Sequence, residues 1–163
     1  MIDRSKLKSV DVLPPVTPGD DLCLAALAIE AKEFILSQKW CRKVCHLSIG
    51  MGYEGIVGVF FVEIEPTRND IDASLWVVVG DLPPAYLVCD NSPDAAAALE
   101  GYIEEMRRWV DALRRGLSLD DIIPVNAPPT GEYADLLAGR LNFLEREVLV
   151  RFRAGEPDDT ARL

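Results

Sequence analysis

The stretch GIVGVFFVEIE, residues Gly55–Glu65, is followed by a polar break at Pro66–Asp72 and by the apolar runs SLWVVVG (74–80) and AYLVC (85–89). β-Branched and aromatic residues fill all three runs, and turn residues bound each one, which is typical of sheet strands joined by short connections. A further strand is expected before them, because the apolar period changes to two from Trp40 onward. Short links between consecutive strands favour an antiparallel meander.

Three helices are expected around this sheet, each begun by residues that favour helix N-termini. The expected caps are Thr17, Ser92 and Thr130. Gly116 is placed to close the second helix, and the third ends near Gly155 with Leu136 on its buried face. Because a four-stranded sheet cannot hide two apolar faces alone, we predict an α+β fold in the order α-β-β-β-β-α-α.

The length of 163 residues fits one domain with a core of its own. We expect an extended arm over residues 1–16, a single α+β domain over 17–153 and a disordered tail over 154–163. The first residues lack the apolar segment of a secretion signal, and no apolar run reaches the roughly 18 to 20 residues of a membrane helix. A cytoplasmic protein with no membrane contact is therefore expected, in which the four cysteines are reduced thiols.

Negative charge is concentrated in the segment that supplies the strands. Of the net charge of −10, residues 44–100 carry −8, from nine acidic side chains and one basic side chain. Such a surface repels nucleic acid and anionic lipid, so no nucleic acid partner is expected, and it favours a basic protein partner or cations. Solubility alone is the plainer explanation of the same charge.

One glycine-rich stretch resembles a nucleotide-binding motif. Residues Gly50–Gly55 read G-x-G-x-x-G, but a dinucleotide site needs a helix after this loop, and here a strand follows. Val57 extends the match to a kinase glycine loop, yet no lysine follows Lys43 and neither H-R-D nor D-F-G occurs. We expect a flexible hairpin turn with glycines at positive φ. Contact with some other small ligand is the lesser alternative.

The group Cys41-x-x-x-Cys45-His46 has metal-binding residue types at an unsuitable spacing. On a strand the two cysteines lie about 13 Å apart, whereas a zinc ion needs each sulfur at about 2.3 Å, and His46 points to the other face. No metal and no cofactor are therefore predicted. His46 is the only histidine and no G-x-S-x-G elbow occurs, so we predict no catalytic residue and lean away from an enzyme.

A binding patch is the remaining candidate site. It combines the carboxylates with two tryptophans, namely Glu63, Glu65, Asp70, Asp72, Trp40 and Trp109. Grouped carboxylates can hold Mg²⁺ or Ca²⁺ or carry out acid–base chemistry, although sheet ends are also where solvated charges normally lie. Partly exposed tryptophans are frequent binding anchors, and packing over the core is their other common role.

These observations favour a non-enzymatic protein-binding module of an immunity, antitoxin-like or regulatory kind that covers a basic partner surface. The alternative is a small-molecule sensor or enzyme with a pocket between sheet and helices, lined by His46, Tyr53 and Glu54. Homodimerisation through an edge strand or through the third helix is compatible with both hypotheses.

Overall fold

A five-stranded antiparallel sheet forms the centre of the molecule in the computed structural model, which describes residues 1–163. Its strands lie in chain order: β1 (Lys8–Ser9), β2 (Cys41–Tyr53), β3 (Val57–Pro66), β4 (Ser74–Gly80) and β5 (Ala85–Val88). The predicted α+β class and the antiparallel meander are confirmed. The sheet has one strand more than predicted, because Lys8 and Ser9 pair with Ile49 and Ser48. A strand of two residues is too short to show an alternating pattern.

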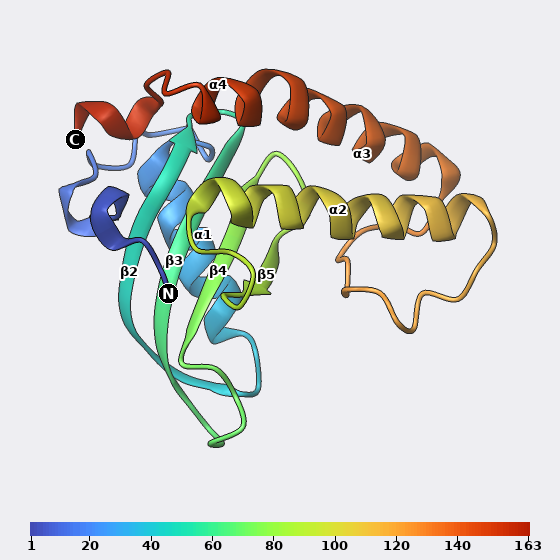
Figure 1. Cartoon of the computed structure of the whole chain (residues 1–163), viewed down its shortest axis with the longest axis horizontal. Coiled ribbons are helices and arrows are strands. Elements are labelled where there is room, and N and C mark those ends of the chain that lie inside the picture. The colour runs from blue at the N-terminus through green and yellow to red at the C-terminus, as the bar shows by residue number, and fades with distance from the viewer.

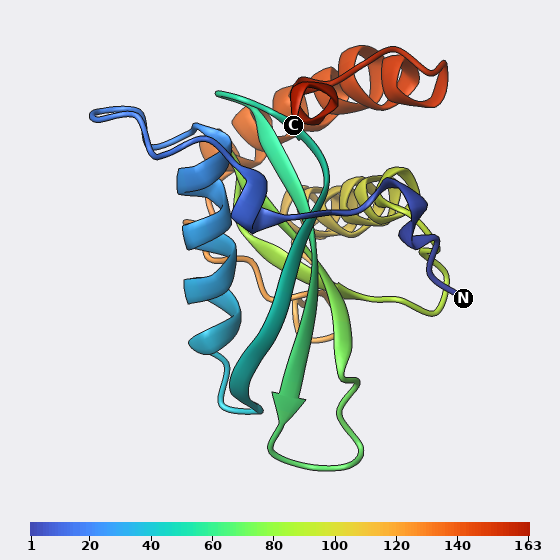
Figure 2. The same cartoon turned by 90° about the vertical axis from the view of Figure 1, so that its left-hand side faces the viewer.

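Helices cover both faces of the sheet (Figures 1 and 2). Helix α1 (Leu24–Leu36) lies on one face, and α2 (Ala95–Arg114) lies on the other with α3 (Gly131–Phe143) packed against it. A π-helical segment, η3 (Leu144–Leu149), continues α3 into α4 (Val150–Arg153). None of these helices combines the length and apolar character needed to cross a membrane.

The core has two layers because β3 and β4 are buried on both faces. Phe61 and Trp76 point towards α2, and their rings meet edge to face at 5.3 Å. Phe60 and Val77 point the other way and pack against α1. Large core side chains therefore occupy the space between the sheet and each helix layer.

Two helix starts differ from the prediction. Helix α1 begins at Leu24 rather than after Thr17, because Gly19 adopts a φ of +80° and Asp20 accepts a hydrogen bond from the backbone N–H of Leu22. This backbone conformation and this hydrogen bond stabilise turns in place of a first helical turn. Helix α2 is capped by Asp94 rather than Ser92. The cap of α3 at Thr130 agrees with the prediction, as does the close of α2 at Gly116, whose φ is +67°.

The two ends of the chain are more ordered than expected. The arm contains the 3-10 helices η1 (Arg4–Lys6) and η2 (Val10–Val12) as well as β1. The tail, expected to be disordered, forms the 3-10 helix η4 (Asp159–Arg162) against β2. Its two aspartates accept hydrogen bonds from β2 and the residue after it: Asp158 from Gly52 N at 2.8 Å and Asp159 from Glu54 N at 2.7 Å. These long-range acceptors, which composition does not reveal, hold the tail in place.

The glycine-rich stretch is mostly strand rather than a flexible turn, since β2 runs to Tyr53. A Cβ atom at Gly50 would lie 2.8 Å from the Cβ of Ala95, and one at Gly52 would lie 2.6 Å from Leu24 Cδ2. These two glycines therefore allow close packing of α2 and α1 on opposite faces of β2. Only Gly55 has the expected positive φ, at +80°.

Candidate functional site

The acidic residues of the predicted patch do not form one free anionic surface. Arginines pair with three of them: Arg4 with Glu63 at 2.6 Å, Arg42 with Glu65 at 3.2 Å and Arg68 with Asp70 at 3.3 Å. Asp81 and Glu100 are paired in the same way, so five of the nine carboxylates in residues 44–100 have an arginine partner. Asp72 has no such ion pair and remains exposed. No cluster of three or more metal-ligating side chains is present.

The two tryptophans of the patch lie in different layers. Trp109 is only 3% exposed and packs in the core between α2 and α3, with its ring 6.2 Å from that of Tyr133. It is therefore not available as a surface anchor. Trp40 is half-buried on the α1 side, where its ring meets Tyr86 edge to face at 5.0 Å. Trp40 alone keeps the partial exposure that an anchor requires.

The alternative pocket residues do not come together. His46 lies exposed on β2 beside a shallow pocket of about 190 Å³. Tyr53 is at the far end of the same strand, roughly 23 Å away at ~3.3 Å per residue, and Glu54 follows it. Burial raises the pKa of Tyr53, and the carboxylates of Asp158 and Asp159 raise it further. The space between sheet and helices, where this pocket was expected, is filled by the core.

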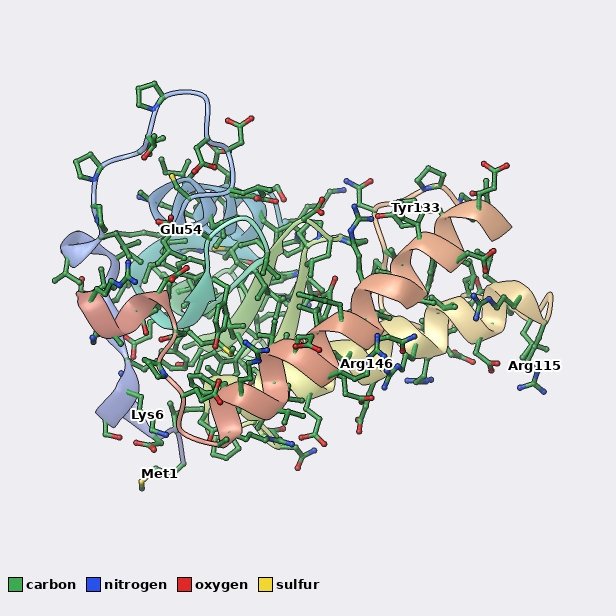
Figure 3. The ribbon with its side chains drawn as sticks, turned by 90° about the horizontal axis from the view of Figure 1, so that it is seen from above. Met1, Lys6, Glu54, Arg115, Tyr133 and Arg146 are labelled. Carbon is green, nitrogen blue, oxygen red and sulfur yellow. The ribbon has the colours of Figure 1, made fainter.

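A larger groove, of about 440 Å³, lies between α3 and two turns of the sheet. We call it the α3 groove. The α3 side and the residue after it contribute Asp135, Leu136, Gly139, Arg140, Phe143 and Leu144, and the β2–β3 and β4–β5 turns contribute Gly55, Ile56, Asp81 and Leu82. In Figure 3, Glu54 and Tyr133 lie on one flank of α3, and Arg146 and Arg115 on the other. The groove is on the Glu54 and Tyr133 flank.

Two large apolar side chains of α3 face this groove instead of the core. Leu136 is 51% exposed and Phe143 is 42% exposed. They are seven residues apart and so share one face of the helix. The prediction that Leu136 is buried was wrong, because Leu137 and Leu141 already occupy the face that meets α2. The sequence of α3 did indicate this exposure, because it contains more apolar residues than one face of a helix can bury.

Gly139 lies between these two side chains on the same helix. Glycine in a helix interior costs about 1 kcal/mol relative to alanine. Nothing in the fold requires it, because a Cβ atom at Gly139 would have no atom within 4 Å and its φ is not positive. A glycine at this place leaves room for another backbone to approach α3 closely.

The helix departs from α geometry where the groove ends. The π-helical segment begins at Leu144, which lines the groove, and continues to Leu149. π-Helical turns are rare and are frequently found at functional sites. The irregularity therefore begins directly after Phe143, at the end of the groove.

The opposite wall is held rigidly. The N–H of Asp81 donates to the carbonyl of Ile56 at 3.0 Å, and the Tyr102 hydroxyl donates to the carbonyl of Pro83 at 2.6 Å. A second pocket of about 340 Å³ shares four residues with the α3 groove and continues past Pro83-Pro84 towards Tyr133. The groove is thus a preformed trough, which lowers the entropic cost of binding.

The charged side chains at the rim of the α3 groove form ion pairs, and few reactive groups line the groove. Arg140 pairs with Asp81, and Arg114 with Asp135. Burial raises the pKa of Cys89 to about 11 and raises that of Cys41, so both are held as thiols, and neither lines the groove. No buried side-chain nitrogen or oxygen atom lacks a hydrogen-bond partner. The site is therefore suited to burying apolar surface.

Comparison with known proteins gives no further guide: no protein-family model matches the chain, and no curated protein or solved structure shows significant similarity to it.

Proposed function

We propose that this chain is a non-enzymatic protein-binding module whose α3 groove receives an apolar helical segment of a partner protein. The observation that carries the proposal is the set formed by Leu136, Gly139 and Phe143, in which two exposed apolar side chains flank a glycine that the fold does not need. Binding modules of the immunity, antitoxin-like or regulatory kind act in this way, by covering a partner surface.

A helical partner suits the shape of the groove. Helices pack at interaxial distances of about 8 to 10 Å, and small residues at the contact allow the closer values. Amphipathic helices occupy such grooves with apolar side chains at positions i, i+3 or i+4 and i+7. Leu136, Gly139 and Phe143 have this spacing, so they match the repeat of a helix lying along α3.

Apolar burial, rather than charge, supplies the affinity in this proposal. Arginine pairing of five carboxylates leaves less free negative surface than the composition indicates. The net charge of −10 still repels acidic proteins and speeds the approach of basic ones. We therefore expect a partner whose binding helix is apolar and whose remaining surface is basic.

Site-specific photo-crosslinking tests the groove directly. A photo-reactive amino acid is placed at Leu136 and, in a control, at Leu117, because both side chains are 51% exposed. The expected result in cells is one adduct of defined mass with the probe at Leu136 and none with the probe at Leu117. Equal labelling at both positions contradicts the proposal.

A pair of glycine variants separates binding from folding. Gly139→Ala and Gly101→Ala each replace a glycine in a helix interior, and neither new Cβ atom meets another atom closer than 3.8 Å. Each is expected to raise the free energy of unfolding by up to about 1 kcal/mol. Only Gly139→Ala should weaken the adduct with the probe at Leu136. An adduct unaffected by Gly139→Ala counts against close helix packing.

A small-molecule site is the second candidate function. The volume of about 440 Å³ lies within the usual range for ligand pockets, and Arg140 provides one polar group. Native mass spectrometry of the purified protein distinguishes the two. A bound small molecule that is lost in Phe143→Lys, together with the absence of any protein adduct, favours this second function.

A further inference from the structure

The two edges of the sheet differ in how well they are protected from pairing with another strand. On the β2 side, β1 pairs with Ser48 and Ile49, and the tail covers the end of the strand with Asp158 and Asp159. The rest of β2 has exposed basic residues and irregular register with β3. Short covering strands, bulges and positive charges are the usual means of preventing edge-to-edge pairing. This edge is therefore protected along its length.

The edge at β5 has almost none of these protections. Its sequence, Ala85-Tyr86-Leu87-Val88, contains no charge and no proline, and its register with β4 has no bulge. Beyond the β4 ladder, no backbone group of residues 85–88 makes a hydrogen bond. Figure 1 shows β5 at the open end of the sheet, on the side away from β2. Its shortness limits the number of hydrogen bonds that pairing can form.

Apolar side chains flank this edge on the α1 face. Tyr86 contacts Trp40 at 5.0 Å and Phe34 at 6.3 Å between ring centroids, and these rings are only partly buried. Val88 on the strand is 50% exposed. Together they provide apolar surface beside an unpaired strand, which is the combination that strand addition uses.

We propose that β5 pairs with β5 of a second copy of this chain, so that two five-stranded sheets join into one. An antiparallel ladder whose two-fold axis passes between Leu87 of one copy and Leu87 of the other sets Tyr86 of each copy opposite Val88 of its partner. Every residue of the strand then meets an uncharged residue, so no like charges are placed opposite each other. This proposal is independent of the α3 groove.

A second copy is favoured as the occupant because the edge is self-complementary. A four-residue ladder alone is too small for a stable complex, since specific interfaces bury about 1,200 to 2,000 Å². Two-fold pairing uses every flanking group twice, so Trp40 and Phe34 of both copies add their surface to the ladder. The same register places Asp90 of each copy beside Pro84 of the other, next to the end of its groove.

Light scattering during size-exclusion chromatography tests the pairing. The expected mass is twice the 18.0 kDa of the chain at high concentration, falling towards 18.0 kDa on dilution. Val88→Lys places a charge on the edge at a position that is 50% exposed, so the fold is retained and the dimer is lost. Leu117→Lys, at an equally exposed site outside β5, leaves the dimer intact.

Hydrogen exchange identifies the interface. Alternate amides of β5 point away from β4 and should exchange about tenfold more slowly in the dimer than in Val88→Lys. A monomer at all concentrations overturns the proposal. So does a dimer that survives Val88→Lys and is broken by Leu136→Lys, which locates the contact on α3 instead. A strand from a different protein that protects the same amides in a monomeric chain also overturns pairing between copies.

Discussion

Arg140 of α3 donates hydrogen bonds from Nη2 and Nε to one carboxylate oxygen of Asp81, at 3.1 and 3.3 Å. The pair connects the two walls of the α3 groove, one on a helix and one on the β4–β5 turn. Both side chains remain in contact with water, with 32% of Arg140 and 57% of Asp81 exposed. The pair therefore positions charge at the rim of the groove and contributes little to the stability of the fold.

Asp81→Asn should lower the free energy of unfolding by less than about 1 kcal/mol, because exposed ion pairs are worth little. The difference from the parent chain should disappear in about 1 M salt, where the screening length is near 3 Å. Urea denaturation at low and high salt measures both. A larger loss that salt does not reduce would mean that the pair holds the groove together.

The tail is expected to stabilise the β2 edge through its carboxylates. Asp158→Ala leaves the buried N–H of Gly52 without its acceptor, which should cost about 1 to 2 kcal/mol of unfolding free energy. The Gly52 amide should also exchange faster with solvent. Glu156→Ala is the matched control, since that exposed side chain makes no hydrogen bond or ion pair. Equal stability of the two variants would contradict this role.

Gly50 is required by packing and not by a ligand. In Gly50→Ala the new Cβ atom would lie 2.8 Å from the Cβ of Ala95 and 3.2 Å from the ring of Trp76. Relieving these contacts should cost about 1 to 3 kcal/mol of stability. Gly131→Ala, where nothing lies within 4 Å, should be neutral or stabilising. Thermal unfolding compares them, and a neutral Gly50→Ala would refute the packing explanation.

The Cys89 thiol should resist alkylation. Burial is the largest cause that raises its pKa from 9.0 to about 11, and nearby Asp72 and Asp90 add to the shift. At pH 8 its thiolate fraction is then about a hundredfold lower than in the unfolded chain. Iodoacetamide labelling with and without urea, followed by mass spectrometry, measures the ratio. Similar rates in both states would show that Cys89 is not protected.

The same pKa shift predicts a dependence of stability on pH. Because the folded pKa is raised, Cys89 keeps its proton longer in the folded chain than in the unfolded chain. Its contribution is complete below pH 9.0, and it is lost as the pH rises from there to about 11. Cys89→Ser should remove this part of the alkaline destabilisation, which urea titrations at pH 8 and pH 10 detect.

Local patterns were sufficient for most of the secondary structure. The three apolar runs after Gly55 and the period-two stretch before it predicted four of the five strands, because side-chain alternation depends only on neighbours along the chain. Caps such as Thr130 and the glycine at Gly116 marked helix ends for the same reason. The predicted start of α1 was wrong because Gly19 and Asp20 favour turns, although Pro18 permits a helix.

The candidate site could not be predicted from those local patterns. Whether Leu136 is buried depends on which face of α3 meets α2. Which carboxylates of residues 44–100 are paired depends on arginines far away in the chain, such as Arg4 and Arg140. The docking of the tail likewise rests on contacts across more than a hundred residues.

The amino-acid sequence by itself thus determined the central stretch Gly55–Cys89 as buried strands of an antiparallel meander, because hydrophobic periodicity and turn residues act locally. Tertiary structure alone decided what remains on the surface: a groove beside α3, paired carboxylates and an unprotected β5 edge. Each of these features depends on which side chains and backbone groups of an element its neighbours in space leave uncovered. Those neighbours are set only when the chain has folded.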